Sequence, residues 1–581
     1  MSGRAVRVLV DEPAVERRFD YLVPDAHAAS VRVGAPVRVP LHGRQVGGWI
    51  VEVDPPTLPG VVLRPLTRIS GWGPEPALVE LAEWAATRWA GRPVHFLRTA
   101  SPPSRVLGLP PAVGPAGDGG GGGVTDPLLI EALAAAGAGG SVVLRLPPAA
   151  DRLPVVAAAA ALGPTLVVTP AHTDGAELAR RLRQAGVPTA VLPREWARAR
   201  AGAGVVIGAR AAAWGPCPGL AAVVVLEEHE EVLQEEASPT WHARDVAVAR
   251  AARAGAPCEL GSTCPSLAGR GRGPHLTPDR ATARRGWPAV DVVDRRQEDP
   301  LRSDLYSTRL VDLVRSGRRV VCVLNRKGRA RLLACRACAE LARCERCGAA
   351  VAGAEDGSLA CPRCSATRPA VCASCGSTAL KLRRIGTARA REDLERLAGV
   401  VVGEVTGDSG ELPRARVLVG TEAVLRRVDR ADAVAFLDLD AELLAPRYRA
   451  AEEAMALVTR AARLLGGKAG GGRLLLQTRL PRHDVVLAAL HADPGLASAA
   501  EAARRVELGW PPYSAMARIS GAGAEAYVTA LRSQPGVRLL GPVDDAWLAR
   551  AADHDALGAA LAATPRPPGQ RLRIAVDPPR V

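Results

Sequence analysis

The stretch that decides how this chain is organised runs from Cys335 to Gly376 and reads CRACAELARCERCGAAVAGAEDGSLACPRCSATRPAVCASCG. It holds four Cys-x-x-Cys pairs, which are Cys335/Cys338, Cys344/Cys347, Cys361/Cys364 and Cys372/Cys375. A two-residue spacer lets one tight turn direct two sulfurs at one metal ion, and zinc prefers four thiolates in a tetrahedron. The stretch therefore predicts two structural Zn²⁺ sites, with an iron–sulfur cluster or redox dithiols as the alternatives.

The spacing alone does not decide how the four pairs share the two ions. Only five residues separate the first two pairs, so a nested scheme or a cross-brace is easier to form than sequential pairing. Gly348 and Gly376 each follow a pair, at a position where the turn often needs a positive φ. The remaining cysteines stand singly among apolar or small residues and are predicted to be small core residues: Cys217, Cys258, Cys264 and Cys322.

Short apolar strands alternate with helical segments on both sides of this stretch. The strands expected before it are 141–146, 165–169, 204–207 and 221–226, and those expected after it are 319–324, 400–405, 416–419, 433–437 and 473–477. Their β-branched runs are nearly continuous, which is typical of parallel sheets covered by helices on both faces. The pattern predicts two α/β lobes that flank a cysteine-rich insertion.

The rest of the chain divides by composition. Residues 1–102 mix alternating strands (6–10, 37–40, 48–53) with one helix over 76–88, and 103–128 form a Gly/Pro-rich linker with five consecutive glycines. We expect lobe 1 over 129–285, lobe 2 with the 335–375 metal module over 286–480, and a C-terminal α+β domain over 481–581. The fold class is therefore multidomain α/β with a small β-rich N-terminal domain.

The net charge of the 581-residue chain is +15, which indicates a polyanionic partner, nucleic acid before membrane. An arginine-rich genome composition is the alternative explanation. Residues 326–391 contain 14 Lys/Arg against 4 Asp/Glu and stay positive after two zinc–tetrathiolate centres are counted. No signal peptide and no membrane span are expected, since the apolar stretch 153–170 is broken by Pro and Gly. A cytoplasmic, nucleoid-associated protein is predicted.

Seven local motifs follow one another along the chain. They are FDYLVP at 19–24, VRVP at 37–40, GARAAAW at 208–214, PTWHARDVA at 239–247, GSTCPS at 261–266, LNRKG at 324–328 and LGWPPY at 508–513. Together they resemble the PriA family of bacterial replication restart helicases. The resemblance spans nearly the whole chain. The family's winged-helix domain has no counterpart, because 103–128 is too short and too rich in glycine.

The resemblance implies two RecA-like helicase lobes and a nested metal scheme. One ion would be held by Cys335, Cys338, Cys372 and Cys375, and the other by Cys344, Cys347, Cys361 and Cys364. It also implies that residues 1–102 bind the 3′ end of a nascent DNA strand. Phe19 and Asp20 match the family's motif, Gly43 or its neighbours would let the backbone approach the strand, and Arg64 is a positional match for a basic contact. Plain core packing is the alternative for Phe19 and Tyr21.

The nucleotide motifs of that family are degraded. After the strand at 141–146 the chain reads RLPPAADR, with no glycine to approach the phosphates and no lysine to contact them. Leu226 stands where a Mg²⁺-binding aspartate is needed before Glu227, and RAARLLGG at 460–467 lacks the two terminal arginines of the arginine-finger motif. We expect no ATP hydrolysis and no catalytic residues, while the residues leave open whether ATP binds.

These features favour a replication restart protein that recognises stalled or abandoned forks and helps to reload the replicative helicase. Its expected partners are forked DNA, single-stranded-DNA-binding protein and primosome or helicase-loading factors. An active ATP-dependent 3′–5′ DNA helicase with an unrecognised nucleotide site is the first alternative. A zinc-stabilised protein-interaction platform without a specific DNA role is the second.

Overall fold

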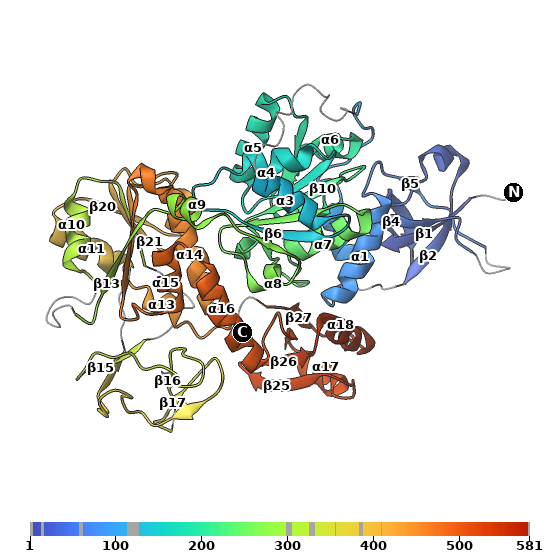
Figure 1. The fold of residues 1–581 in the computed structure, drawn as a ribbon. Helices are drawn as coiled ribbons and strands as arrows, with labels where there is room; N and C mark the ends of the chain where they lie inside the picture. The colour runs from blue at the N-terminus through green and yellow to red at the C-terminus, as the bar shows by residue number, and fades with distance from the viewer. Residues whose placement is uncertain are drawn as a thin grey trace.

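The computed structural model describes residues 4–578 apart from 13–14, 16, 57–61, 113–126, 298–304, 325–331, 355, 383–386 and 408. Most of the expected linker and all of 325–328 in the LNRKG motif therefore lie outside the described residues. Figure 1 shows five units: the N-terminal sheet on the right, lobe 1 in the centre, lobe 2 on the left, and the cysteine module and the C-terminal unit below.

The N-terminal unit is an antiparallel sheet in the order β2-β1-β4-β3-β5, followed by two helices. Its elements are β1 Ala5–Val10, β2 Arg18–Leu22, β3 Pro36–Leu41, β4 Arg44–Val53, β5 Arg68–Ile69, α1 Pro76–Arg88 and α2 Pro93–Ala100. The valines of β1 and β3 point to one face of the sheet, which gives this sheet its own small core. Pro76 and Pro93 stand in the first turns of α1 and α2, where a missing N–H costs nothing.

Lobe 1 is a parallel sheet in the order β12-β6-β11-β10-β7-β9-β8 with helices on both faces. The strands are β6 Ser141–Arg145, β7 Thr165–Val168, β8 Thr189–Val191, β9 Val205–Gly208, β10 Ala222–Leu226, β11 Cys258–Ser262 and β12 His275–Leu276. The helices are α3 Pro127–Ala136, α4 Leu153–Ala160, α5 His172–Gln184, α6 Trp196–Ala201, α7 Ala243–Ala254, α8 Leu267–Arg270 and α9 Arg280–Arg285. Residues 153–170 form the buried helix and strand that the sequence predicts.

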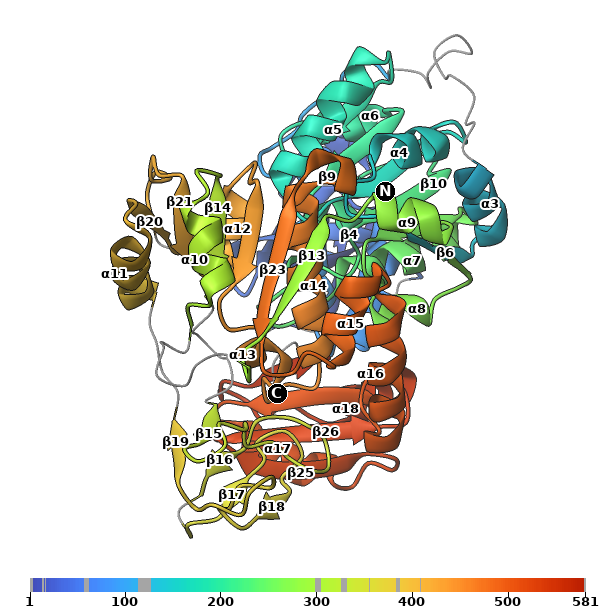
Figure 2. The same cartoon turned by 60° about the vertical axis from the view of Figure 1, so that its left-hand side comes forward.

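Lobe 2 is a second parallel sheet in the order β13-β23-β22-β14-β21-β20. Its strands are β13 Ala289–Asp294, β14 Val320–Val323, β20 Val402–Val405, β21 Val417–Gly420, β22 Ala433–Phe436 and β23 Arg473–Thr478. Its helices are α10 Thr308–Arg315, α11 Thr387–Ala398, α12 Ala423–Arg427, α13 Asp440–Leu443, α14 Ala450–Leu465, α15 Asp484–His491 and α16 Gly495–Leu508. The apolar faces of α15 and α16 pack into the core of lobe 2, beside α14 and β13 (Figure 2).

The cysteine module, residues 332–382, is inserted between β14 and β20 and contains only short strands. These are β15 Leu333–Cys335, β16 Ala352–Gly353, β17 Leu359–Ala360, β18 Thr367–Arg368 and β19 Leu380–Leu382. The C-terminal unit, residues 510–578, is an antiparallel sheet in the order β25-β26-β24-β27 with two helices. Its elements are β24 Ala515–Ser520, β25 Arg538–Val543, β26 Ala546–Ala551, β27 Arg573–Val576, α17 Ala524–Leu531 and α18 His554–Ala563.

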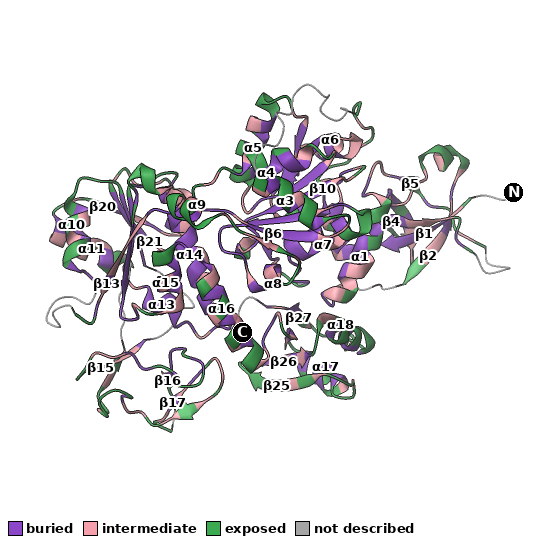
Figure 3. Ribbon diagram, in the orientation of Figure 1, coloured by how far each residue is buried: buried purple, intermediate pink, exposed green. Residues whose placement is uncertain are grey.

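One continuous apolar core joins the N-terminal helices, one face of the lobe 1 sheet and the C-terminal unit. A row of aromatic rings runs through it, from Trp84 and Trp89 through Phe96 to Trp214 and Trp241, with centroids 5.2–6.3 Å apart. Apart from β12 and β13, the strands of both lobes are buried along most of their length (Figure 3). The multidomain α/β class with parallel sheets is confirmed, and the four single cysteines are buried as predicted.

The middle of the lobe 1 sheet contains a carboxyl group, Glu259 on β11. Glu259 pairs in register with Val142 and Val224, is 1% exposed, and its two carboxyl oxygens have no hydrogen-bond partner among the described residues. Burial raises its pKa to about 8. Glu259 is therefore predominantly neutral in the folded chain at pH 7.

We expect Glu259→Met to stabilise the protein more at pH 8 than at pH 5. The folded pKa of Glu259 lies above the unfolded value of about 4.3, so the native carboxyl loses stability as the pH rises between the two values, and methionine does not. Midpoints of thermal unfolding at both pH values measure the difference. The control is Glu131→Met on the exposed side of α3, which should shift the midpoint little. An equal gain for Glu259→Met at both pH values would contradict the assignment.

Candidate metal centres and interlobe site

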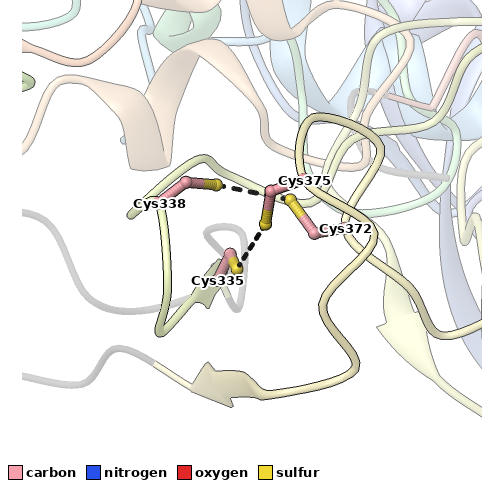
Figure 4. A group of neighbouring side chains, drawn as sticks. All are labelled: Cys335, Cys338, Cys372 and Cys375. Atoms are coloured by element: carbon pink, nitrogen blue, oxygen red, sulfur yellow. Dashed lines mark hydrogen bonds between the residues drawn. The ribbon is translucent and has the colours of Figure 1, made fainter.

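The structure brings the eight module cysteines together as two groups of four. Cysteine group 1 contains Cys335, Cys338, Cys372 and Cys375, and cysteine group 2 contains Cys344, Cys347, Cys361 and Cys364. Within each group all four sulfurs lie within 4.8 Å of one another. Figure 4 shows group 1, with the sulfurs of two knuckles facing each other. This is the nested grouping that the family resemblance implies, and each group could hold a metal ion.

The sulfur separations fit a tetrahedral four-thiolate site. The closest pairs are 3.5–3.6 Å apart, for example Cys335 to Cys375 and Cys347 to Cys361. Zinc with Zn–S bonds of about 2.3 Å needs sulfurs roughly 3.8 Å apart. The pKa of Cys335 is lowered to about 6, chiefly because the backbone N–H of Cys338 donates to its sulfur. That N–H donor favours the thiolate form of Cys335, which is the form that binds a metal.

All four knuckles share one backbone turn. The residue after each pair adopts a positive φ of 58–74°, and its N–H donates to the carbonyl of the first cysteine of the pair. These residues are Ala339, Gly348, Ser365 and Gly376. The sequence pointed to this turn only at the two glycines, whereas the geometry is imposed at the alanine and the serine as well.

The two groups differ in their surroundings. Cys338 and Cys375 of group 1 are exposed, whereas Cys344, Cys347 and Cys361 of group 2 are buried. Group 2 lies in a small apolar core that includes Val351 and Leu359. A metal ion in group 2 would therefore support more packed structure than one in group 1.

The predicted DNA-contact residues lie on different parts of the N-terminal sheet. Phe19 and Tyr21 face its core, and the Tyr21 hydroxyl donates to the carbonyl of Pro40 at 3.0 Å. Asp20 projects from the opposite face, where Arg7 donates to its two carboxylate oxygens at 2.8 and 3.1 Å. Because Phe19 and Asp20 are neighbours on one strand, their side chains point in opposite directions.

Gly43 and Arg64 lie at the ends of loops in the same unit. Gly43 forms a two-residue hairpin turn with His42, both with positive φ, and a Cβ at Gly43 would meet no atom within 4 Å. Its backbone is thus open to a ligand. Arg64 is exposed and lies near Tyr21, whose pKa is raised by burial and lowered in part by that arginine.

A buried cluster of ion pairs lies at the carboxyl ends of three neighbouring strands of lobe 1. Strands β6, β11 and β10 are neighbours, so their carboxyl ends bring together the loop ending at Arg152, Thr263 and Glu227. Nε and Nη2 of Arg152 donate to Glu227 at 2.8 and 2.7 Å, and Nη2 also donates to the Thr263 hydroxyl at 3.0 Å. The side chains of Arg152 and Glu227 are only 7% and 2% exposed.

The loop after β6 holds a cation rather than phosphates. Nη1 of Arg152 donates to the carbonyl oxygens of Pro147 and Ala150 at 3.2 and 2.5 Å. A phosphate-binding loop instead directs its N–H donors at the ligand. The guanidinium of Arg152 therefore fills the loop, because the backbone carbonyl oxygens of the loop accept hydrogen bonds from it.

Lobe 2 contributes the other half of this interlobe charge cluster. Arg463 on α14 contacts Glu227 at 2.7 Å, and Arg460 on the same helix donates to Glu230 at 3.1 Å. Arg426 approaches Glu230 at 3.5 Å. Burial alone would raise the pKa of Glu227, but the charges of Arg152 and Arg463 hold it well below its usual range.

The sequence did not reveal these roles. Arg460 and Arg463 stood in a motif that had lost its terminal arginines, and Arg152 stood in a loop noted for what it lacked. A buried acid after a strand was the only signal. A buried acid implies that cations lie near it, but it does not identify them. Two of these cations come from a helix more than 220 residues away in the sequence.

A cleft of about 610 Å³ opens beside this cluster, between lobe 1, lobe 2 and the C-terminal unit. Arginines of α1, lobe 1 and lobe 2 line it, among them Arg88, Arg270, Arg272 and Arg449, and the C-terminal unit contributes Tyr513, His554 and Asp577. No helix among the described residues is long and apolar enough to cross a bilayer.

We expect Arg152→Ala to destabilise the protein by about 3 kcal/mol at pH 7, since it removes one partner of a buried ion pair. The loss should shrink as the pH falls towards 5, because the Glu227 carboxyl of the variant can then take up a proton. Arg181→Ala, which breaks an exposed pair with Asp151, is the control and should cost less than about 1 kcal/mol. Thermal unfolding at both pH values measures this, and equal losses for the two variants would refute the assignment.

We expect two zinc ions per chain, and about one in either Cys338→Ser or Cys361→Ser. Cys361→Ser should lower the unfolding midpoint more, because its group is embedded in the small core of the module. Metal analysis of the purified proteins gives the stoichiometry, and calorimetry gives the midpoints. Clearly fewer than two metal ions in the unmodified protein, or an equal loss of midpoint in both variants, would be inconsistent with this account.

Comparison with known proteins identifies relatives of the N-terminal unit and of the chain as a whole. A family model of the 3′DNA-binding domain (3′BD) of PriA matches residues 7–102. The chain is 29% identical to the probable replication restart protein PriA of Mycobacterium tuberculosis over 92% of its own length and 90% of that protein. It is 28% and 31% identical to the replication restart proteins PriA of Bacillus subtilis and Treponema pallidum, over 54% of its length in each case. These alignments cover 43% and 51% of the two relatives, so the chain spans about half their length. Residues 7–102 thus match the family model of the PriA 3′DNA-binding domain, and the chain is similar to PriA proteins along almost its whole length.

Proposed function

We propose that this chain is a replication restart protein that binds stalled or abandoned replication forks and helps to reload the replicative helicase. The observation that carries the proposal is the 3′DNA-binding domain over residues 7–102, in a chain that aligns with relatives named as replication restart proteins. In this proposal the lobes are RecA-like and serve as a scaffold rather than as a motor. The protein acts in the cytoplasm at the nucleoid.

The N-terminal sheet would receive the 3′ end of a DNA strand. Arg7 holds the Asp20 carboxylate through one bond to each oxygen, which leaves lone pairs free to accept from a 3′-hydroxyl. The open backbone at Gly43 permits close approach, and the exposed Arg64 supplies a phosphate contact. Phe19 is half-buried against the core, so its role in base stacking is the weaker part of this arrangement.

The ions in the two cysteine groups are proposed to be zinc, with a structural role. Closed four-thiolate sites leave no coordination position for a substrate. Arginines of the module and of the cleft between the lobes would contact DNA phosphates, in keeping with the net charge of +15. Single-stranded-DNA-binding protein and helicase-loading factors are the proposed protein partners.

ATP-driven unwinding is not part of the proposal. The interlobe charge cluster supports this view, because Arg152 lies where phosphates would lie and Glu227 is neutralised by two arginines. A nucleotide would have to displace a buried guanidinium and leave Glu227 beside its own negative phosphates.

The test is binding to a fork that carries a nascent 3′ end, compared with blunt duplex, over a range of salt concentrations. We expect tighter binding to the fork, no change on adding ATP, and no phosphate release above background. Arg64→Ala should weaken fork binding and reduce the salt slope by about 1, because one phosphate contact is lost.

Arg68→Ala is the matched control, since Arg68 is an exposed arginine on β5 at the other edge of the same sheet. It should bind the fork as the unmodified protein does. Equal affinity for the fork and blunt duplex at physiological salt would reject fork recognition, and brisk DNA-stimulated phosphate release would reject the loss of the motor.

A further inference from the structure

The side chain of one arginine of the cysteine module is buried against residues that lie outside the module. Arg363 lies between Cys361 and Cys364 in a knuckle of cysteine group 2, and its side chain is only 4% exposed. Its Nη2 donates to the carbonyl of Tyr448 in lobe 2 at 3.2 Å, and its guanidinium lies over the Trp510 ring at 5.1 Å. Arg363 thus contacts the segment where lobe 2 meets the C-terminal unit.

We propose that Arg363 is the positioning residue through which cysteine group 2 fixes the cysteine module and the C-terminal unit against lobe 2. The metal-bound knuckle holds the backbone of Arg363 at both ends, because the cysteines on either side bind the same ion. Its Nη1 donates to the carbonyl of Cys347, in the other knuckle of group 2, at 3.2 Å. Both knuckles of group 2 therefore fix the position of the guanidinium. This inference rests on the proposed metal occupancy.

A chain of buried charges continues from Arg363 into lobe 2. Its Nη2 lies 3.8 Å from Glu501 on α16, and Glu501 accepts a 2.9 Å hydrogen bond from Arg505. The side chains of Glu501 and Arg505 are 1% and 2% exposed. Arg505 also donates to the carbonyl of Pro511 at 3.1 Å, which ties α16 to the start of the C-terminal unit.

The same chain reaches lobe 1. Arg505 pairs with Glu452 on α14, and the other oxygen of Glu452 accepts a 2.7 Å hydrogen bond from the N–H of Leu267. Leu267 begins α8, directly after the GSTCPS motif of lobe 1. A continuous set of ion pairs and hydrogen bonds thus links a metal knuckle to the interlobe contact through Glu501, Arg505 and Glu452.

The chain offers a matched comparison for Arg363. Arg346 occupies the same position in the other knuckle of group 2, between Cys344 and Cys347. It is exposed and has no hydrogen bond or ion pair recorded among the described residues. The two arginines share one metal group and one local geometry, and they differ in what surrounds the guanidinium. Of the two arginines, Arg363 is the one whose side chain contacts lobe 2 and Trp510.

Two other hydrogen bonds join the module to lobe 2, and they limit the change expected when the Arg363 side chain is removed. The Ala350 N–H donates to the carbonyl of Leu444 at 2.9 Å, and Arg479 donates to that of Ala339 at 3.2 Å. These contacts bind lobe 2 alone. Loss of Arg363 should therefore loosen the module against the C-terminal unit without detaching it from the chain.

The experiment uses the full-length protein with its metal bound. Bioorthogonal spin labels are placed at two exposed positions, Ala373 in the module and Glu525 on α17, and the distribution of distances between them is measured. Hydrogen exchange of the α16 amides is followed in parallel. We expect Arg363→Ala to keep two metal ions per chain, to broaden the distance distribution and to speed α16 exchange about tenfold.

Arg346→Ala should match the unmodified protein in all three measurements, and Arg363→Lys should lie between them because lysine keeps the charge but not the planar fork. A narrow, unmodified distance distribution in Arg363→Ala with both metals present would overturn the proposal. Loss of one metal ion in Arg363→Ala would also overturn it, because Arg363 would then serve the metal site rather than docking. None of these measurements involves DNA, so their outcome is independent of fork recognition.

Discussion

Glu227 places a buried negative charge at the contact between the two lobes. Glu227 is almost fully buried at the end of a central strand, and its backbone has a positive φ of 50° that an L-residue rarely adopts. A carboxylate in that position is tolerated only if cations and hydrogen-bond donors surround it. Arg152 and Thr263 supply them from lobe 1, and Arg463 supplies one from lobe 2. The charge balance of this residue therefore requires both lobes.

That requirement makes the carboxyl edge of the lobe 1 sheet a structural contact between the lobes. Parallel strands bring their carboxyl ends to one edge, so the loops after β6, β10 and β11 meet whatever residues they carry. In a nucleotide-binding protein the acid at this edge faces a metal and phosphates. Here a guanidinium provides the positive charge that the metal would supply, and carbonyl oxygens of the loop solvate that guanidinium.

The sequence predicted the features that depend on local pattern and missed those that depend on distant partners. The α1 helix has the predicted bounds, and each strand that was predicted for the two lobes lies within one or two residues of its expected position, because burial on both faces leaves a continuous apolar run. The short strands β8 and β12 were not predicted. β13 was missed because Asp291 and Asp294 interrupt its apolar residues at the sheet edge. β11 was missed because Glu259 stands in its middle.

The candidate site shows the same division. The eight cysteines could be read from spacing, since both knuckle ligands lie within four residues of each other. The contacts of the Arg363 side chain could not be predicted from the sequence, because they depend on how the module folds back onto α16 and Trp510. The sequence pattern around Arg346 and Arg363 is nearly the same, and only the tertiary structure distinguishes an exposed arginine from a buried one.

Buried charge chains of this kind constrain which residues can change. Removing one member leaves its partner buried and unpaired, which costs about 3–5 kcal/mol, whereas replacing a whole pair with apolar residues of similar size is often neutral. Glu227 shares its cations with lobe 2, and Glu452 and Arg505 link lobe 2 to both lobe 1 and the C-terminal unit. No single residue of these chains can therefore be exchanged without a cost in the contact between units. An acid at position 227 therefore has a structural role in the contact between the two lobes, through its ion pair with Arg463.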